Sequence, residues 1–186
     1  MDRASFLKSL AGFSVAPMAL AACGRSQSRP RTSGVAPDTI DVHDRRTEIP
    51  PINRSREEWR SILSSDVFHI MFEEGTEPRH SSPLLNENRK GTFICAACRL
   101  ELFPSTTKFE SGTGWPSFWA PLEDRVETKK DMKLGYARTE YHCKRCGGHQ
   151  GHIFEDGPEP TGLRYCNNGL ALQFVPAEES LPPLRT

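Results

Sequence analysis

The stretch Tyr141-His142-Cys143-Lys144-Arg145-Cys146-Gly147-Gly148 indicates a strand that runs into a glycine turn and carries two cysteines spaced as CxxC. A second pair has the same spacing, Cys95-Ala96-Ala97-Cys98. Two CxxC turns in one domain suit a tetrahedral zinc site, because each turn presents two thiolates on the same side of the backbone. The pairs are farther apart than in a compact zinc ribbon. We therefore expect the metal to join two strands that are distant in the sequence.

Disulfides or redox dithiols are the alternative interpretation of these two pairs. A redox CxxC usually opens a helix, whereas the second pair follows a predicted strand. Structural zinc is therefore favoured, with one Zn²⁺ per chain. Its four ligands would be Cys95, Cys98, Cys143 and Cys146.

Cys166 stands apart from both pairs, in Gly162-Leu163-Arg164-Tyr165-Cys166-Asn167-Asn168. A basic side chain precedes it by two residues, an amide side chain follows it by two, and two histidines lie upstream in His149-Gln150-Gly151-His152-Ile153-Phe154. Cationic and hydrogen-bonding neighbours lower a thiol pKa from its ordinary value of about 8.5, and the thiolate is the nucleophile. The sequence therefore predicts Cys166 to be an activated nucleophile.

In this order, the motifs resemble those of the B-type methionine sulfoxide reductases, enzymes that reduce the R epimer of methionine sulfoxide. The resemblance runs from about Ser55 to about Pro176. It rests on the two cysteine pairs, on Ser111-Gly112-Thr113-Gly114-Trp115-Pro116-Ser117-Phe118, on residues 149–154 and on residues 164–168. The resemblance implies a fold of two antiparallel sheets with helices at the N-terminal end.

The same resemblance implies a role for each site residue. Cys166 would attack the sulfoxide sulfur. The groups that would bind the sulfoxide oxygen, directly or through water, and deliver a proton are His149, His152 and Asn168. Arg164 would favour the thiolate, and Asp156 would orient a histidine or the water. Trp115 would form an aromatic wall for the S-methyl group.

Recycling of the oxidised enzyme follows from the cysteine count. Attack would leave a sulfenic acid on Cys166, which many relatives resolve with a second cysteine at the position of Thr113. Four cysteines here are assigned to zinc and Cys23 to a lipid, so no resolving thiol remains. We therefore expect oxidised proteins or peptides carrying methionine-R-sulfoxide as substrates and a thioredoxin-like or other external thiol as the reductant.

The N-terminus has the pattern of an export signal. Arg3 and Lys8 precede an apolar, small-residue run at 10–22 that is shorter than the ~20 apolar residues of a membrane-spanning helix. Leu20-Ala21-Ala22-Cys23 resembles a bacterial lipobox, which would lipidate Cys23 and anchor the protein to a membrane of the cell envelope, facing the periplasm or the outer surface. A signal peptide that is cleaved without lipidation is the alternative.

Four segments are predicted along the chain: a signal peptide at 1–22, the lipidated cysteine and a flexible tether at 23–51, a catalytic domain at 52–178 and a tail at 179–186. The tether is expected because its polar composition cannot bury enough apolar surface to offset the entropy of ordering. In the domain, Ser55-Arg56-Glu57-Glu58 predicts a helix start, and a second helix is predicted at 66–74. Short apolar runs predict strands at 92–95, 102–103, 108–109, 135–143, 152–154 and 170–175.

The charge balance excludes an obvious nucleic-acid partner. Residues 1–22 hold two of the 24 basic and one of the 24 acidic residues, which leaves a formal net charge of −1 and no basic stripe. The charged run at 127–133 is predicted to be a solvated hairpin end, and the domain is expected to act as a monomer.

Two other functional classes fit parts of the pattern. Cys166, a histidine and Asn168 also fit a cysteine hydrolase or acyltransferase. A zinc-binding module without catalysis would instead hold Cys166 as a buried, inert thiol.

Overall fold

The computed structural model describes residues 49, 50, 52–133 and 135–186, and the structural statements below concern these residues. The predicted signal peptide, Cys23 and nearly all of the predicted tether lie outside them. Among the described helices, none has the length and apolar character needed to cross a membrane.

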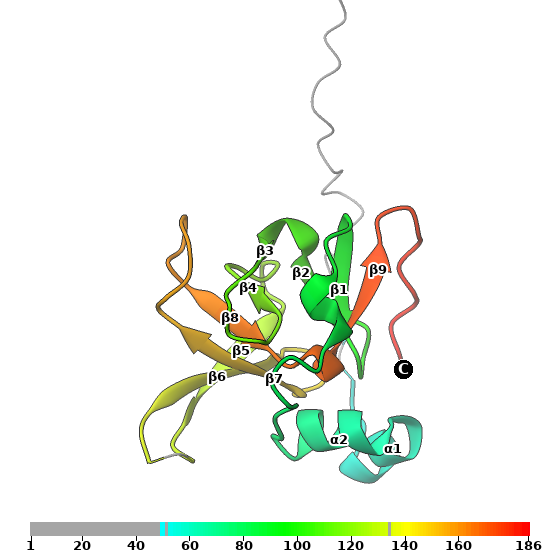
Figure 1. Cartoon of the computed structure of the whole chain (residues 1–186). Coiled ribbons are helices and arrows are strands. Elements are labelled where there is room, and N and C mark those ends of the chain that lie inside the picture. Colours follow the sequence, from blue (N-terminus) through cyan, green and yellow to red (C-terminus); the bar gives the residue numbers. More distant parts are fainter. Residues whose placement is uncertain (1–48, 51, 134) are drawn as a thin grey trace, which may run out of the picture. The chain divides into compact units, whose positions relative to one another are not determined.

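In the part of the chain that the structure describes, two short helices precede nine strands (Figure 1). The helices are α1 (Arg56–Ile62) and α2 (Ser65–Phe72). The strands are β1 (Gly91–Cys95), β2 (Glu101–Pro104), β3 (Lys108–Phe109), β4 (Ser117–Phe118), β5 (Val126–Asp131), β6 (Arg138–Cys143), β7 (His149–Phe154), β8 (Arg164–Asn167) and β9 (Leu172–Pro176). Three 3₁₀ turns, η2 (Pro83–Asn86), η3 (Ser105–Thr107) and η4 (Gly169–Ala171), connect them.

The predicted capping box opens α1. The Ser55 side chain accepts from the Glu58 amide at 3.2 Å, and the Glu58 carboxylate accepts from the Ser55 amide at 2.7 Å. Trp59 is only 2 % exposed and stacks on Phe72 of α2 with ring centroids 5.4 Å apart. Helix α2 ends two residues earlier than predicted, because Glu74 has a positive φ of 54° that a right-handed helix cannot contain.

The strands form two antiparallel sheets, as predicted, with the orders β2-β1-β9 and β3-β4-β8-β7-β6-β5. Three strands were missed by the sequence reasoning, β4, β5 and β8. β4 and β8 are short, and β8 carries mostly polar residues, so neither shows an alternating pattern long enough to detect. β5 carries mostly charged, exposed residues and was predicted only as a hairpin end. The predicted strand at 170–175 starts later, because Leu170 and Ala171 belong to η4.

An aromatic cluster packs the two sheets together. Phe103 of β2 stacks on Phe118 of β4 with centroids 4.2 Å apart, and it meets Tyr141 of β6 and Tyr165 of β8 edge to face at 6.1 and 6.0 Å. Phe103, Phe118 and Tyr141 are fully buried. The small sheet contributes Phe103, and the large sheet contributes the other three rings. This packing of aromatic rings between the sheets therefore fixes the buried face of β8.

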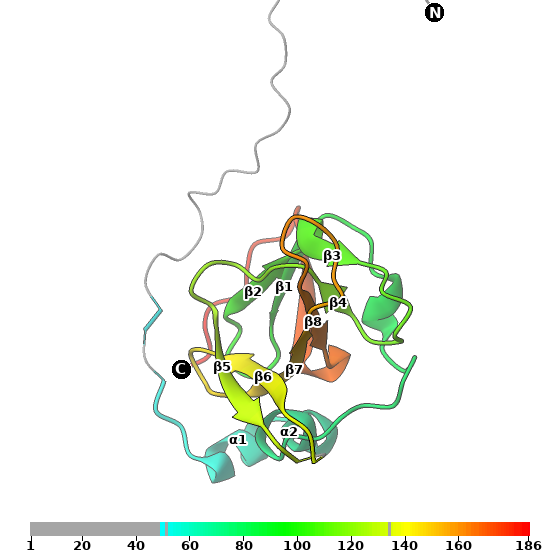
Figure 2. The same ribbon diagram turned by 90° about the vertical axis from the view of Figure 1, so that its left-hand side faces the viewer.

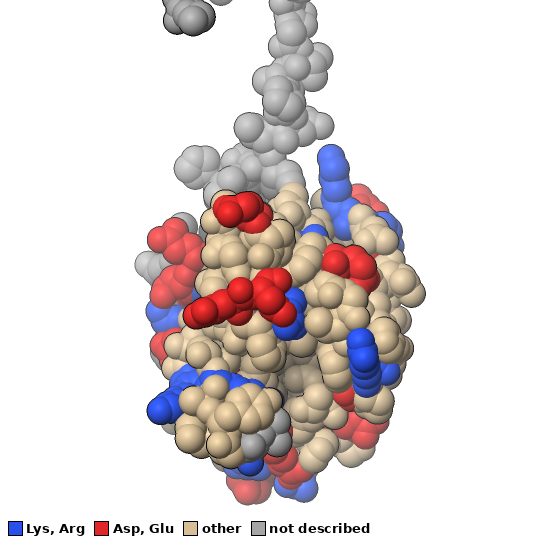
Figure 3. All heavy atoms as spheres, turned by 60° about the vertical axis from the view of Figure 1, so that its left-hand side comes forward, with Lys and Arg blue, Asp and Glu red and all other residues tan. Residues whose placement is uncertain are grey.

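Strands β5 and β6 form a long hairpin at one side of the molecule (Figures 1 and 2). Glu74 ties the hairpin to the end of α2, since it pairs with Lys129 at 2.6 Å and with Lys133. The hydrogen bonds from these lysines, that from Lys129 first, lower the pKa of Glu74 to about 2. Acidic and basic side chains are mixed on the face that Figure 3 presents. A surface that binds nucleic acid would instead carry a cluster of basic side chains.

Candidate functional site

The four predicted zinc ligands come together where the two sheets meet. Cys95 ends β1 of the small sheet, and Cys143 ends β6 of the large one. All four sulfur atoms lie within 4.8 Å of one another, with Cys95 to Cys146 at 3.6 Å and Cys98 to Cys143 at 3.5 Å. A disulfide needs about 2.05 Å, whereas a tetrahedron with Zn–S bonds of about 2.3 Å has sulfur atoms roughly 3.8 Å apart. The arrangement therefore fits a metal ion.

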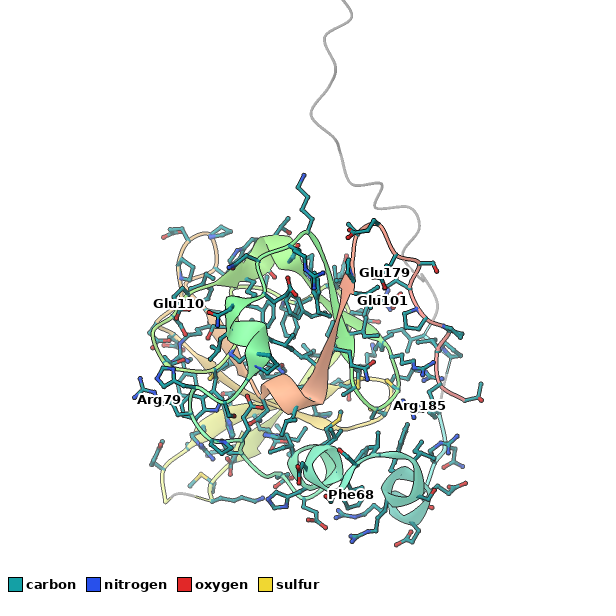
Figure 4. All side chains as sticks on the ribbon, turned by 45° about the vertical axis from the view of Figure 1, so that its right-hand side comes forward. Phe68, Arg79, Glu101, Glu110, Glu179 and Arg185 are labelled. Carbon is teal, nitrogen blue, oxygen red and sulfur yellow. The ribbon has the colours of Figure 1, made fainter. Side chains whose placement is uncertain are left out.

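Neighbouring groups close this cluster from two sides. Gln150 is fully buried and donates its amide to the Cys95 sulfur at 3.9 Å. Arg145 donates to the carbonyls of Cys98 and Arg185 at 3.2 and 2.8 Å, and the Arg185 amide donates to the Cys98 carbonyl at 3.1 Å. Figure 4 shows Arg185 on the C-terminal tail. The segment predicted as a separate tail thus packs against the first CxxC turn.

Cys166 lies on β8, between β4 and β7, where it is paired with Ser117 and His152. It borders a cavity of about 140 Å³. The cavity is lined by Thr76, Trp115, Arg138, Gly151, His152, Phe154, Cys166, Asn167 and Asn168. The predicted nucleophile, one predicted histidine, the predicted aromatic wall and the predicted amide thus meet in one site, although they come from separate segments.

Gly151 shows how closely the backbones approach beneath this site. A Cβ at this position would come within 1.9 Å of the Cys166 carbonyl oxygen. A side chain at position 151 would therefore push β7 away from β8. The pairing of His152 with Cys166 thus requires a glycine at this position.

Glu77 holds two walls of the cavity and was not recognised from the sequence. Its backbone carbonyl accepts from Trp115 Nε1 at 3.2 Å, and its amide donates to Asn168 Oδ1 at 3.1 Å. Its carboxylate, in a side chain that is 3 % exposed, accepts from the amides of Gly169 and Leu170 at 2.7 and 2.9 Å. No sequence motif marks this residue, because its partners lie 38 to 93 positions along the chain.

The loop that carries Trp115 is held from outside by Arg79. Arg79 donates to the carbonyls of Thr113 and Gly112 at 2.6 and 2.9 Å. Figure 4 shows Arg79 and Glu110 on the same side of the molecule. Gly114 has a φ of 87°, and a Cβ there would meet the Arg79 side chain at 2.4 Å. The glycine is therefore required for this contact.

Two buried carboxylates contact the two predicted histidines. Asp131 Oδ2 lies 2.8 Å from His152 Nε2, and Glu140 Oε1 lies 2.9 Å from His149 Nδ1. His149 is 3 % exposed and sits behind His152, with ring centroids 5.5 Å apart, so only His152 borders the cavity. Asp131 lies within the run at 127–133 that was predicted to be solvated, but it is only 7 % exposed, which corrects that prediction for this residue.

Asp156 contacts an arginine and neither of the two predicted histidines, so the part of its prediction that concerned a histidine is wrong. Its carboxylate instead pairs with Arg164 through two hydrogen bonds of 2.8 and 2.9 Å. The Arg164 guanidinium also lies 4.3 Å from the centre of the Phe154 ring. Because side chains alternate along a strand, Arg164 and Cys166 share one face of β8. Asp156 therefore orients the arginine that faces the thiol.

The thiol of Cys166 is less acidic than the sequence suggested. Burial raises its pKa above the ordinary value, while the charge of Arg164 and hydrogen bonds from Thr113 and Arg164 lower it in part. Thr113 is in turn bonded to Ser111 at 2.8 Å. The prediction of a lowered pKa is therefore wrong for the free protein, because desolvation outweighs the favourable neighbours.

We predict that replacing Arg164 with Gln slows alkylation of Cys166 by iodoacetamide roughly three- to tenfold near neutral pH. Loss of a nearby positive charge raises the pKa further and leaves less thiolate. The rate is measured by mass spectrometry of the Cys166 peptide across a pH series. Arg89→Gln, which removes an exposed arginine paired with Glu87, is the control and should behave as wild type. An unchanged pH profile in Arg164→Gln would show that Arg164 does not tune the thiol.

Comparison with known proteins places the chain in a family. The SelR domain family matches residues 63–176. A protein of Leptospira interrogans is 49 % identical over 124 residues, which cover 66 % of this chain and 95 % of the relative. A protein of Methanosarcina barkeri is 49 % identical over 129 residues, 69 % of this chain and 91 % of the relative. One of Agrobacterium fabrum is 47 % identical over 128 residues, 68 % of this chain and 95 % of the relative.

All three relatives are named peptide methionine sulfoxide reductase MsrB. The matched residues include both cysteine pairs and every residue that lines the cavity around Cys166. The chain therefore belongs to the SelR family, the B-type methionine sulfoxide reductases.

Proposed function

We propose that this chain reduces peptide-bound methionine-R-sulfoxide to methionine, with Cys166 as the nucleophile and an external thiol as the final reductant. The observation that carries the proposal is the cavity in which a cysteine thiol, a histidine ring, an amide side chain and an indole ring face the same space. Its volume of about 140 Å³ suits the end of one methionine side chain rather than a bulky group.

The chemical step needs no group beyond those at the cavity. The Cys166 sulfur attacks the sulfoxide sulfur and takes its oxygen, so that the substrate is reduced by two electrons and Cys166 becomes a sulfenic acid. The proton lost by the thiol is balanced by the proton gained by the oxygen. Asn168 would hold this oxygen by a hydrogen bond and His152 would pass the proton, a proposal supported by the fact that both border the cavity beside Cys166.

Stereochemistry would follow from the fixed walls of the site. Trp115 is anchored through its indole N–H to Glu77, so its ring offers an immobile surface to the S-methyl group. If the methyl group packs against Trp115 and the oxygen faces His152, the rest of the substrate peptide can leave the cavity in only one direction. With the peptide in that direction, the S epimer would point its methyl group at His152 and its oxygen at the indole ring. The polar groups of the site would then have no hydrogen-bond partner.

We predict that the wild-type protein, with dithiothreitol as the reductant, reduces dabsyl-labelled methionine-R-sulfoxide. The S epimer should be reduced no faster than in a control without enzyme. Product is followed by chromatography on each pure epimer. Cys166→Ser should abolish the activity, and Trp115→Ala should impair it. Comparable turnover of both epimers would contradict the proposal, as would hydrolysis or acyl transfer at Cys166 without sulfoxide reduction.

Recycling is proposed to use an external thiol because Thr113 occupies the position at which many relatives carry a resolving cysteine. The Thr113 side chain lies close enough to lower the pKa of Cys166, but a hydroxyl cannot form a disulfide. Two external thiols would then convert the sulfenic acid back to a thiol, forming one external disulfide and one water molecule.

A single turnover without reductant should therefore leave a Cys166 sulfenic acid that dimedone traps. In Thr113→Cys, the new thiol stands beside Cys166, so trapping should be lost and a disulfide between the two residues should appear in the mass spectrum. Thr113→Ser, which keeps a hydroxyl, is the matched control and should trap like wild type. A disulfide from Cys166 in the wild-type protein would contradict the proposal and would point to Cys23.

The metal is proposed to be structural zinc. Four sulfur ligands suit Zn²⁺, and the cluster lies where the ends of β1 and β6 meet rather than at the cavity. Burial raises the pKa of the Cys95 thiol, so this thiol would be protonated without a metal, and the two turns would lose their common link.

Cys98→Ser should lose the metal and unfold at a much lower temperature, because zinc binding is folding free energy of about 10–16 kcal/mol in small zinc domains. Metal content is measured by mass spectrometry and unfolding by circular dichroism. Cys166→Ser should keep one zinc per chain and melt like wild type. A folded wild-type protein without zinc, or with disulfides inside the pairs, would refute the assignment.

Attachment to a membrane is proposed from the sequence at 20–23 alone. A lipidated Cys23 would tether the domain in the cell envelope. Cys23→Ala should then move the protein from the membrane fraction to the soluble fraction on ultracentrifugation, with Cys166→Ser as the control that stays with the membrane. Unchanged retention of Cys23→Ala would rule out the anchor.

A further inference from the structure

We propose that Asp131 is the positioning residue for His152 and that it fixes the ring so that Nδ1 is the nitrogen presented to the sulfoxide oxygen. The inference rests on the proposed function and adds to it a residue from the β5–β6 hairpin. Asp131 thereby makes the contact with a histidine that the sequence had suggested for Asp156.

Two donors besides His152 fix the Asp131 carboxylate, the Arg138 guanidinium and the Lys133 amide. Oδ2 lies 2.8 Å from His152 Nε2 and 2.5 Å from the Arg138 guanidinium, and Oδ1 accepts from the Lys133 amide at 2.8 Å. The side chain is 6 % exposed. A carboxylate held by a backbone amide and an arginine cannot rotate freely. Its contact with His152 therefore restricts the orientation of the imidazole ring.

The contact also selects the tautomer. An ionised carboxylate only accepts hydrogen bonds, so His152 Nε2 must carry a hydrogen. The hydrogen bond from the Lys133 amide, followed by that from His152, lowers the pKa of Asp131 and keeps it ionised. Nδ1 is then the nitrogen that accepts a proton from the site or donates one to the substrate oxygen. A buried aspartate has this same role towards the histidine of serine proteases.

The sheet register shows that this contact is specific to the hairpin. His152 of β7 is paired with Glu140 of β6, yet Glu140 contacts His149 instead. Asp131, at the end of β5, is paired with Arg138 and reaches past β6 to His152. Each of the two carboxylates therefore contacts a different histidine. Of the two, only the carboxylate of Asp131 contacts the histidine that borders the cavity.

The charges around His152 determine how the contact affects its protonation. The titratable and charged groups that face it are Asp131 from β5, Arg138 and Glu140 from β6, His149 from β7 and Cys166 from β8. Burial lowers the pKa of His152, and the hydrogen bond to Asp131 raises it in part. Neutralising Asp131 removes the raising contribution, so protonated His152 would be lost at a lower pH than in wild type.

The experiment compares wild type, Asp131→Asn, Asp131→Glu and Glu74→Gln, each with its zinc content and melting curve. The amide of Asn can donate to Nε2 or accept from it, so the tautomer is no longer selected. With a peptide R-sulfoxide and dithiothreitol, kcat of Asp131→Asn should fall about 100-fold, the scale of acid–base catalysis, while KM changes less than about threefold. The alkaline limb of its kcat profile should move to lower pH, and Asp131→Glu should recover part of the rate.

Glu74→Gln separates positioning from loosening of the hairpin. It breaks the ion pairs to Lys129 and Lys133 that tie the hairpin to α2, but it leaves the Asp131 contact in place. Its kcat should remain within about twofold of wild type, as expected for a partly exposed ion pair. An equal loss in Glu74→Gln and Asp131→Asn would overturn the proposal in favour of a purely structural role. A kcat of Asp131→Asn within threefold of wild type would overturn it as well.

The tautomer is read without any activity assay. In ¹⁵N-histidine-labelled protein, long-range ¹H–¹⁵N spectra should show His152 with hydrogen on Nε2 in wild type and a changed pattern in Asp131→Asn. Hydrogen on Nδ1 alone in wild type would overturn the inference. Absence of R-sulfoxide turnover in wild type would instead remove the proposed function, and the spectra would still decide whether Asp131 sets the tautomer.

Discussion

The four-cysteine cluster is the constraint on which the rest of the molecule depends. It joins the end of β1 to the end of β6, and so it links the two sheets at the point where the chain turns into β7. The Cys143 amide donates to the Gly148 carbonyl at 2.9 Å, which closes the second turn one residue before His149. The turn thereby sets where β7 starts, and with it the residue of β7 that faces Cys166.

The substrate cavity has a second support that is independent of the metal. Glu77 uses its amide, its carbonyl and its carboxylate to hold residues on the loops before β4 and after β8. A buried carboxylate is costly unless it is hydrogen-bonded, and here two backbone amides satisfy it. The cysteine cluster places the strands, whereas Glu77 places the indole and amide groups above them.

The electrostatics of the site show how burial and charge oppose each other. Cys166 is shielded enough that desolvation raises its pKa, despite Arg164 and Thr113. A thiol that keeps its proton until substrate arrives is consistent with sulfoxide reduction, because the oxygen that is transferred must gain a proton. His149 and His152 each contact a buried carboxylate, whereas Asp156, four residues after His152, pairs with Arg164 instead.

The amino-acid sequence by itself predicted antiparallel β structure, the clustering of four cysteines and the importance of Cys166, because short motifs such as the CxxC turn reflect local backbone geometry. Trp115, His152 and Asn168 were assigned to the site of Cys166 through the resemblance to the B-type methionine sulfoxide reductases, and all three border its cavity. Only the tertiary structure decided which carboxylate contacts which histidine. Asp131 lies 21 residues from His152, in a stretch of charged residues with no motif to single it out. The tertiary structure also decided the pKa of Cys166 and the role of Glu77, since burial and contacts between distant segments arise only when the two sheets pack.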